Sequence, residues 1–446
     1  MRVRLPTVRA VALTAGALAA CGGPLEVRVR LVEPCDQAPL DEVDFLRFEP
    51  RGEGIDGPSQ ASVEAVSGRR GPPLDIPLAP DFQLLVTGHA TDFDAPPTVF
   101  GVSRPVDLSL SGGATEVPVP VSVLGRFHRA TRLDRAPGAP DRCADPRRAR
   151  FGATATPLSG GRVLVVGGAR YDRAFLEYVR EVELFDPRTG AFRVVGRLDD
   201  ALVRRDHTAS RLDDGRVLVA GGRRPSELVP GAEEAVRSAF VIDARDPAAV
   251  EISGGGLRMV EARSGHGAAR LVDGRVVLVG GRTIDPAAPT LEASTLLDTV
   301  EVFDPRLGTF GPVAAAEGQP LALSAPRWGA RVLALPGRAD WVVVGGLGVD
   351  GPSDAVEVLR LAGGVGSRTV APSRLGGGAV QVAAALTQDG DLLVSGGSRR
   401  PALVTEAAPG AEETLEVWGI DARTGVAERL CFDRLRGARA GHTVSV

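Results

Sequence analysis

The stretches GRVLVVGG (161–168), GRVLVAGG (215–222) and GRVVLVGG (274–281) decide the fold of this chain. Each is a short apolar strand that ends in a glycine doublet, and DWVVVGG (340–346) and GDLLVSGG (390–397) repeat the pattern. The doublets begin at residues 167, 221, 280, 345 and 396, so the successive steps are 54, 59, 65 and 51 residues. Self-similarity at this period, with room for four short strands in each unit, is typical of a β-propeller.

The doublets are predicted to be structural, because two glycines let backbones approach closely and adopt positive φ where the innermost strands converge. The ten glycines are Gly167, Gly168, Gly221, Gly222, Gly280, Gly281, Gly345, Gly346, Gly396 and Gly397. In three units an Asp-Gly pair precedes the doublet strand, as at Asp214-Gly215 and Asp273-Gly274. This pair predicts a tight type I′ hairpin between the first two strands of a unit.

The repeats also align outside the doublets. A segment that opens with arginine precedes the first four doublets, as in RSGHGAARL (263–271), and a segment such as TVEVFDPRLGTF (299–310) follows the doublet. The fifth unit has Ala379 in place of this arginine. This combination resembles the kelch repeat over about residues 150–446, strongly in the first three units and more weakly in the fourth and fifth. The resemblance implies an all-β fold with a kelch-type β-propeller.

The end of the chain bears on the number of blades. RAGHTVSV (439–446) has the features of the first strand of a further unit, after five complete units. In kelch propellers the ring is commonly closed by strands from both termini in one blade. The resemblance therefore implies that this strand pairs with an N-terminal strand, for which 121–133 is the best candidate. We expect six blades, with five as the alternative.

The first 20 residues have the features of an export signal. Arg2, Arg4 and Arg9 precede an apolar stretch, 10–20, that is too short to span a bilayer as a helix. The small residues before Cys21 resemble the lipobox of bacterial lipoproteins, which implies cleavage and lipidation at Cys21. The alternative is an ordinary secretory signal. We expect an exported protein, anchored by lipid in the bacterial cell envelope at the outer membrane.

The remaining sequence before the repeats predicts a second domain. Between residues 24 and 125, apolar and polar residues alternate in several short runs such as VDFLRFEP (43–50), separated by turns rich in proline and glycine. This pattern predicts a small β-sandwich. The expected organisation is a signal peptide at 1–20, a lipidated N-terminus and β-sandwich at 21–125, a linker that contributes to ring closure at 126–149, and the propeller at 150–446.

Three further cysteines follow Cys21. Cys143 and Cys431 occupy equivalent places in two repeats that a closed ring would bring together. A disulfide between them would stabilise the ring by about 3–5 kcal/mol in an oxidising compartment. The alternative is that both are free, buried thiols. No C-x-x-C or Cys/His pair is present in the sequence, so no zinc site is expected.

The composition and the histidines exclude several function classes. All 52 basic residues are arginine and the net charge is −4, which argues against a nucleic-acid-binding protein. His207, His266 and His442 recur in register, which favours a contact between blades over catalysis. Some kelch proteins are copper oxidases, but the only tyrosines, Tyr171 and Tyr178, share one loop here. We expect no metal and no cofactor.

The loops and the arginines indicate where a ligand would bind. The connections after the doublets are long and unlike one another, and binding residues usually lie on such loops of a rigid scaffold. The candidate ligand-binding residues are the arginines that follow the doublets, Arg170, Arg223, Arg282 and Arg399. A second set opens the first strands: Arg150, Arg204, Arg263, Arg327 and Arg439. Both sets could instead pair with carbonyl groups or with loop acids such as Glu233.

We therefore expect a lipid-anchored binding protein that holds an unknown protein partner or an acidic glycan on the long-loop face. Since no catalytic motif is recognised, no catalytic residue is assigned. The alternative is an exported carbohydrate-active enzyme, because some kelch propellers are sugar epimerases or mutarotases. Such an enzyme would need an acid/base pair in the axial pocket, for instance Glu177 or Glu181 beside an arginine.

Overall fold

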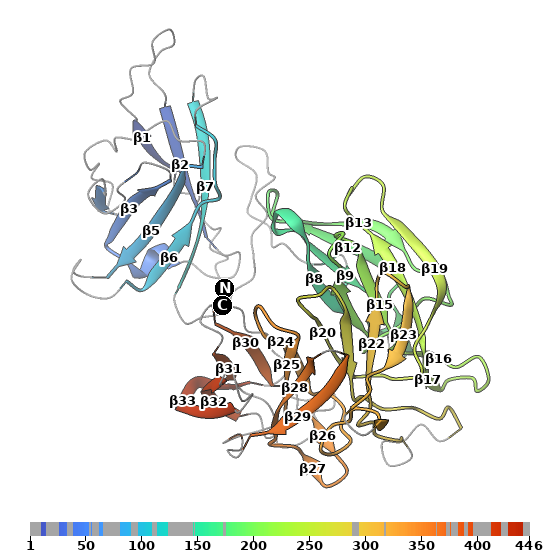
Figure 1. The fold of residues 1–446 in the computed structure, drawn as a ribbon. Helices are drawn as coiled ribbons and strands as arrows, with labels where there is room; N and C mark the ends of the chain where they lie inside the picture. The colour runs from blue at the N-terminus through green and yellow to red at the C-terminus, as the bar shows by residue number, and fades with distance from the viewer. Residues whose placement is uncertain are drawn as a thin grey trace. The chain divides into compact units, whose positions relative to one another are not determined.

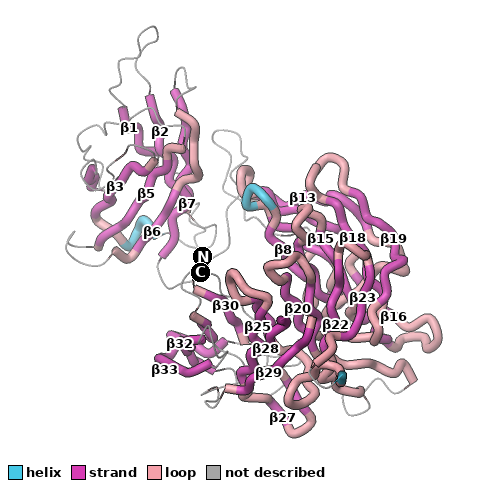
Figure 2. The backbone as a smooth tube through the Cα atoms, viewed as in Figure 1, coloured by secondary structure: helices cyan, strands magenta, loops and turns pink. Residues whose placement is uncertain are grey.

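The computed structural model describes residues 10–14, 26–33, 39–52, 55, 62–65, 81–90, 97–108, 114–123, 146, 148–172, 175–287, 294–315, 318–362, 364–371, 375, 382–387, 391–395, 412–420 and 427–439. These residues form strands, turns and loops with two short 3-10 helices, so the predicted all-β class is confirmed (Figure 2). None of the described helices is long and apolar enough to cross a membrane. Contacts divide the chain into two units, Met1–Arg147 with Asp186–Phe192, and Arg148–Phe185 with Arg193–Val446.

The first unit contains a seven-stranded sheet in the order β1-β2-β7-β6-β5-β3-β4 (Figure 1). The strands are β1 (Ala10–Thr14), β2 (Glu26–Val32), β3 (Phe45–Arg51), β4 (Ser62–Ala65), β5 (Gln83–His89), β6 (Val99–Val102) and β7 (Ala114–Val123). Along β3, Leu46, Phe48 and Pro50 are buried and their neighbours are not, which is the period of a strand with one face against a core. Because the described strands connect into one sheet, the two packed sheets of the predicted β-sandwich stay a prediction.

Strand β1 lies inside the segment predicted to be a signal peptide. In the full-length chain it pairs antiparallel with β2, with Ala10 opposite Arg30 and Thr14 opposite Glu26. Its partner β2 runs parallel to β7 on the other side. Cleavage before Cys21, which stays a prediction, would remove β1 and make β2 the edge of the sheet.

Within the described residues, the second unit contains five four-stranded antiparallel sheets (Figure 1). The first contains β8 (Thr154–Pro157), β9 (Val163–Val166), β12 (Glu181–Asp186) and β13 (Ala191–Arg197). The second contains β14 (Thr208–Arg211), β15 (Val217–Ala220), β18 (Ser238–Asp243) and β19 (Glu251–Arg258). The third contains β20 (Gly267–Arg270), β21 (Val276–Val279), β22 (Val300–Asp304) and β23 (Thr309–Pro312). The fourth contains β24 (Arg331–Ala334), β25 (Asp340–Val344), β28 (Val356–Ala362) and β29 (Val365–Val370), and the fifth contains β30 (Ala383–Leu386), β31 (Leu392–Ser395), β32 (Glu412–Ile420) and β33 (Ala427–Arg439).

The five sheets follow one another as the blades of a propeller do, and we call them the first to the fifth blade. Their innermost strands, β8, β14, β20, β24 and β30, lie next to one another in chain order. The second strands β15, β21 and β25 are buried along their whole length, because each blade packs on a neighbour through both faces. One hydrophobic cluster joins Val277 of the third blade to Trp341 of the fourth, so the core lies between blades.

In the part of the chain that the structure describes, three connections between second and third strands form two-stranded ribbons that follow the glycine doublets. The ribbon of the first blade contains β10 (Ala169–Asp172) and β11 (Phe175–Tyr178). The ribbon of the second contains β16 (Arg223–Pro225) and β17 (Glu233–Ala235), and that of the fourth contains β26 (Leu347–Gly348) and β27 (Gly351–Pro352). The post-doublet loops therefore carry strand structure of their own.

The first three glycine doublets join their blade to the next one. The N–H groups of Gly168, Gly222 and Gly281 donate hydrogen bonds of 2.8, 2.8 and 2.9 Å to the carbonyl oxygens of Arg204, Arg263 and Arg327 in the following blade. A Cβ atom on the preceding Gly221, whose φ is 61°, would lie 2.6 Å from the Arg263 carbonyl oxygen. No side chain fits in that space, and an L-residue would be strained at that φ.

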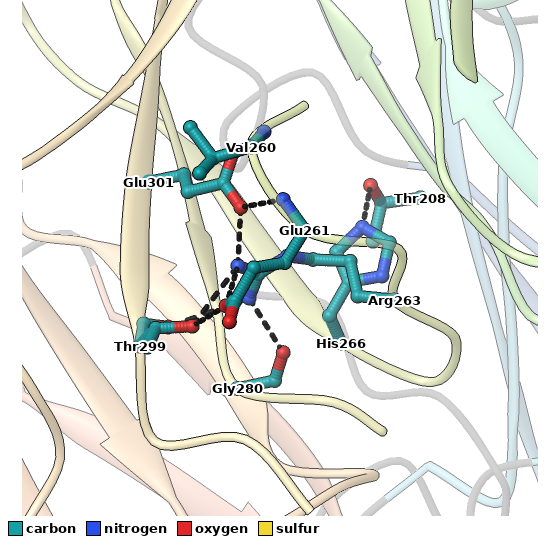
Figure 3. A network of polar contacts seen from close by, with 8 residues as sticks. All are labelled: Thr208, Val260, Glu261, Arg263, His266, Gly280, Thr299 and Glu301. Carbon is teal, nitrogen blue, oxygen red and sulfur yellow. Dashed lines mark hydrogen bonds and ion pairs between the residues drawn. The ribbon is translucent and has the colours of Figure 1, made fainter. Parts of the chain in front are cut away.

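The arginines that open the first strands are buried inside the blades; the exposed fractions of Arg204, Arg263 and Arg327 are 0, 0 and 1%. In the third blade, Arg263 donates to the carbonyl oxygen of Gly280 at 2.7 Å and pairs with Glu301 at 2.5 Å (Figure 3). Arg150 and Arg327 pair in the same way with Glu183 and Glu357. These three arginines bind glutamates of the third strand, and Arg150 and Arg263 also donate to a carbonyl oxygen of their doublet. The structural alternative expected carbonyl groups or loop acids as partners, so the carbonyl groups agree with it and the strand glutamates do not.

The second blade departs from this pattern, because Phe240 stands where the other blades have glutamate. Arg204 lies 4.7 Å from the centre of the Phe240 ring and has no carboxylate partner among the described residues. It donates instead to the carbonyl oxygens of Gly221 and Ser238. Burial, together with the charge of Arg224, lowers the pKa of Arg204 to about 9.

The Asp-Gly turns differ from the prediction. A type I′ turn needs positive φ at both central residues, but only Gly215 and Gly274 have positive φ, 86° and 87°. The N–H of Gly215 donates to the carbonyl oxygen of Leu212, so Asp213 and Asp214 are the central residues of the turn. Gly215 follows in the left-handed region, which is the three-residue loop with a glycine bulge. The residue of positive φ was predicted correctly and the turn type was wrong.

Ring closure stays a prediction. Arg439 lies at the end of β33, opposite Glu412 of β32, whereas the prediction placed it at the start of a new innermost strand. The start of the proposed N-terminal partner, residues 121–123, belongs to β7 of the first unit. Residues 124–145 and 440–446 lie outside the described residues. Cys21, Cys143, Gly396, Gly397, Arg399 and the side chain of Cys431 lie outside them as well.

Candidate functional site

A cavity of about 220 Å³ lies where three innermost strands begin in the second unit. Its lining consists of residues 206–207 of the second blade, 264–266 of the third and 328–331 of the fourth, with Arg223 and Arg282. Arg223 and Arg282 directly follow the glycine doublets of the second and third blades. Two of the four candidate ligand-binding arginines therefore line one cavity at the long-loop ends of the blades.

Backbone hydrogen bonds between successive blades build the wall of the cavity. The N–H of Asp206 donates to the carbonyl oxygen of Gly152 at 2.8 Å, that of Gly265 to Asp206 at 2.8 Å, and that of Gly329 to Gly265 at 2.7 Å. These four residues occupy equivalent positions, each two residues after a strand-opening arginine. The side chains that line the cavity are thus attached to a fixed backbone.

Asp206 departs from the repeat at this position. The first, third and fourth blades have glycine there, and the φ values of Gly152, Gly265 and Gly329 are 66°, 61° and 71°. Asp206 adopts the same conformation, with φ of 55°, and is the one described non-glycine residue with positive φ. A residue held in this region costs of order 1 kcal/mol and is often found at a functional site.

A network of ionic groups surrounds Asp206. Arg205 forms a bidentate pair with Glu233, at 2.8 and 2.6 Å, and donates to Asp206 Oδ2 at 3.1 Å. Arg223 donates through Nε to the same Oδ2 atom at 2.7 Å, and its NH1 atom lies 3.4 Å from Glu233. The Tyr178 hydroxyl, from the ribbon of the first blade, donates to Glu233. The network therefore links two ribbons to the wall of the cavity.

The pKa values of the network follow from burial and charge. Burial alone would raise the pKa of Glu233, but the hydrogen bond from Arg205 and the charge of Arg223 lower it below its usual range. Burial alone would lower the pKa of Arg205, but Glu233 and Asp206 raise it. Burial and the Glu233 charge raise the pKa of Tyr178. At neutral pH, Glu233 and Arg205 are therefore charged and Tyr178 keeps its proton.

Arg282 differs from the other arginines of the cavity. Its guanidinium lies 4.8 Å from the centre of the Trp328 ring, in a cation–π contact. No hydrogen bond or ion pair joins the guanidinium group of Arg282 to any of the described residues. Burial, followed by the charge of Arg223, lowers the pKa of Arg282 to about 10. Arg282 thus remains charged at neutral pH without an anionic partner.

Arg331 also lines the cavity, from the start of β24. Its Nε atom donates to the carbonyl oxygen of Val382 at 2.8 Å, next to the innermost strand of the fifth blade. Burial lowers the pKa of Arg331. Its two terminal nitrogens have no partner in the part of the chain that the structure describes. The cavity and its ionic network hold four guanidinium groups and two carboxylates, a net charge of +2.

The other described candidates lie outside the cavity lining, and Arg399 is not among the described residues. Arg170 pairs with Glu177 across its own ribbon, so the acid that the enzyme alternative suggested already has a cation. Burial would raise the pKa of Glu181, but a backbone hydrogen bond and the charges of Arg148 and Arg197 lower it. Neither carboxyl lines the cavity.

His207 and His266 lie between blades, as the repeat predicted. The His207 Nε2 atom is 3.0 Å from Thr154 Oγ1 of the first blade, and the His266 Nε2 atom is 2.9 Å from Thr208 Oγ1 of the second (Figure 3). Burial and the nearby Arg204 lower the pKa of His207 to about 3. Burial and Arg263 hold the pKa of His266 well below its usual value. Both rings are therefore neutral at physiological pH.

Sequence reasoning missed Asp206, Trp328 and Arg331. A signal for Asp206 was present, because aspartate stands where three other units have glycine. Trp328 and Arg331 gave no comparable signal, since each contacts a residue of a neighbouring blade, Arg282 and Val382 respectively. The described residues contain no group of three or more His, Cys, Asp or Glu side chains that could hold a metal ion.

No protein-family model matches the sequence, and no curated protein is similar to it. Among solved structures, the one titled "Structure of YjhT" is similar to 67% of this chain and to 87% of its own, with 13% sequence identity and a TM-score of 0.48. The architecture described above rests on the strand pairing of this chain.

Proposed function

We propose that this protein binds a small anionic ligand of the acidic-glycan class in the cavity at the long-loop ends of the second, third and fourth blades. The observation that carries the proposal is Arg282, a charged guanidinium without a carboxylate or carbonyl partner among the described residues. Buried charges in proteins are generally paired, so an unpaired one in a cavity is well suited to an anion supplied by a ligand.

The size and the lining of the cavity support a small, partly apolar ligand. A volume of about 220 Å³ is below the range of drug-sized pockets, which begins at about 300 Å³. Trp328 gives an aromatic face next to the guanidinium of Arg282, and Arg331 offers two further N–H-bearing nitrogens. An anionic sugar has both an apolar ring face and a carboxylate, and guanidinium binds carboxylate through paired hydrogen bonds.

We also propose that the protein acts at the cell envelope, held by lipid on Cys21. The support is the basic segment, the short apolar stretch and the small residues before Cys21. Replacing Cys21 by serine should abolish incorporation of radiolabelled palmitate and release the protein from the membrane fraction. Palmitate incorporation that persists in this variant would rule out lipidation at this residue.

The test of the binding proposal is isothermal titration calorimetry at pH 7 and low salt, with glucuronate and propionate as probes. Replacing Arg282 by alanine should weaken binding about 10- to 100-fold, the range expected for charge-assisted hydrogen bonds. Replacing Arg170 by alanine is the matched control, because it removes a post-doublet arginine that pairs with Glu177 outside the cavity. Equal loss in both variants, or binding that survives in both, would contradict the assignment.

The enzyme alternative, a sugar epimerase or mutarotase, stays a prediction. Glu177 and Glu181 do not line the cavity, and Asp206 is the carboxyl group among the described lining residues. Nuclear magnetic resonance of a freshly dissolved anomer of glucuronate, with and without the protein, would detect such a reaction.

A further inference from the structure

Asp206 stands where the first, third and fourth blades have glycine. Its backbone hydrogen bonds to Gly152 and Gly265 are those of the glycine positions in neighbouring blades, so the backbone does not require a side chain there. A Cβ atom on Gly152 would lie 2.7 Å from Asp206 Oδ1, so the carboxylate lies directly over the neighbouring glycine. The strained φ and the close packing both indicate that the carboxylate itself is used.

The two carboxylate oxygens of Asp206 have different surroundings. Oδ2 accepts from Arg205 at 3.1 Å and from Arg223 at 2.7 Å. Oδ1 accepts no hydrogen bond from any of the described residues, although Asp206 lines the cavity. The carboxylate can therefore accept a hydrogen bond from a ligand without giving up its ion pairs.

The same contacts occupy Arg223. Its Nε and NH2 atoms lie 2.7 and 2.6 Å from Asp206 Oδ2, and its NH1 atom lies 3.4 Å from Glu233. Arg282 and Arg331 have no such carboxylate among the described residues. Asp206 thus reduces the positive charge that the cavity offers and leaves the guanidinium groups of Arg282 and Arg331 for the ligand.

On the basis of the proposed function, we propose that Asp206 determines the specificity of the cavity, which takes a singly charged anion bearing hydroxyl groups and disfavours multiply charged anions such as phosphate. A ligand hydroxyl donates to Asp206 Oδ1 while the ligand carboxylate pairs with Arg282. A hydrogen bond to a charged acceptor is stronger than one to a neutral acceptor, which favours hydroxylated ligands. A second negative charge on the ligand is repelled by the Asp206 carboxylate, which disfavours phosphate.

Two substitutions separate the charge of Asp206 from its hydrogen-bonding capacity. Asp206→Gly introduces the residue of the first, third and fourth blades, removes the acceptor and releases Arg223. Asp206→Asn removes the charge, keeps an oxygen acceptor and tolerates the left-handed conformation. Circular dichroism and thermal unfolding of both variants establish that the fold is kept.

The probes are glucuronate, propionate and inorganic phosphate, measured by calorimetry at pH 7.5 and constant ionic strength. The full-length protein should bind glucuronate at least about tenfold more tightly than propionate. In Asp206→Gly this preference should vanish and phosphate should bind about tenfold more tightly than in the parent. In Asp206→Asn phosphate should also gain affinity, while the preference for glucuronate is partly kept. A gain in affinity for phosphate is not expected from a variant that is merely less well folded.

The outcomes distinguish this inference from the proposed function. If Arg282→Ala weakens anion binding but Asp206→Gly leaves the ratio of glucuronate to phosphate affinity unchanged, the specificity role is wrong and the binding site stands. If phosphate loses affinity in Asp206→Gly, the carboxylate does not act by repulsion and the inference is overturned. If no probe binds the parent protein, both the proposed function and this inference are wrong.

Discussion

Lowering the pH from 7 to 5.5 is expected to destabilise the second unit through His207 and His266. The two rings are 5 and 6% exposed and lie between blades. Burial and Arg204 hold the pKa of His207 at about 3, and burial and Arg263 hold that of His266 well below its usual value. The folded protein therefore binds no proton at either ring over this pH range.

The magnitude follows from proton linkage. In the unfolded chain a histidine has a pKa of about 6.5, so at pH 5.5 each ring is about nine-tenths protonated. Since the unfolded state binds more protons than the folded state, the free energy of unfolding decreases as the pH falls. The contribution of the two neutral rings has its full value well above pH 6.5 and is lost below it. Each histidine then contributes a loss of about 1.2 kcal/mol between pH 7 and 5.5, and the pair about 2.5 kcal/mol. That is a large share of the roughly 5–15 kcal/mol typical of a folded protein.

Urea unfolding at pH 7 and pH 5.5, followed by tryptophan fluorescence, measures the loss. His207→Gln and His266→Gln should each reduce the difference between the two pH values by about 1.2 kcal/mol, and the double variant by about 2.5 kcal/mol. The other histidines are present in every protein of the series, so their contribution cancels. The reasoning fails if the double variant keeps the full pH dependence of the parent, or if the parent is equally stable at both pH values.

Three further predictions concern single positions. Glu301→Gln should lower the free energy of unfolding by about 3–5 kcal/mol, because it removes the carboxylate, 2% exposed, that pairs with the buried Arg263. Glu261 also pairs with Arg263 but is 38% exposed, so Glu261→Gln should lower the free energy of unfolding by under about 1 kcal/mol in the same urea assay. Gly221→Ala should lower the free energy of unfolding by about 2–5 kcal/mol, because φ is 61° and the new Cβ would lie 2.6 Å from a backbone oxygen. Gly308 has a similar φ of 66° but no atom within contact distance of a Cβ, so Gly308→Ala should lower it by about 1 kcal/mol. Equal losses in thermal unfolding would contradict the packing argument. Tyr178 should remain protonated up to pH 11, so Tyr178→Phe should leave the amplitude of the ultraviolet titration at 295 nm unchanged, and a smaller amplitude in the variant would show that this phenol ionises.

The all-β class was predictable because the same short pattern, an apolar strand that ends in a glycine doublet, recurs five times in the sequence. The apolar runs before the second, third and fourth doublets are the buried second strands β15, β21 and β25, and their continuous apolar character follows from packing on both faces. The glycines with positive φ were also predictable, since few other residues adopt that region. The turn type at Gly215 was not, because the same Asp-Gly pair suits two hairpin geometries that differ by one residue.

The candidate site was predictable only in part. Arg223 and Arg282 follow doublets, so their repeat position indicated the correct end of the blades. Their different partners were not predictable, because the partner of Arg223 precedes it by 17 residues on the same blade while Arg282 contacts Trp328 of the next one. Contacts between blades depend on the rotation from one blade to the next, and no local pattern in the sequence specifies that rotation.

The joint between blades has an evolutionary consequence. At three boundaries, the N–H of the second doublet glycine of one unit donates to the carbonyl oxygen of the arginine that opens the next unit. Such a head-to-tail interface uses two different surfaces, so a duplicated unit contains both the donor and the acceptor of the contact. Gene duplication can therefore lengthen the array without compensating mutations at the new boundary. In such an array the acceptor of the first unit and the donor of the last unit have no neighbour of the series to bind. Selection at the two ends of the array then acts on the groups that satisfy this acceptor and this donor.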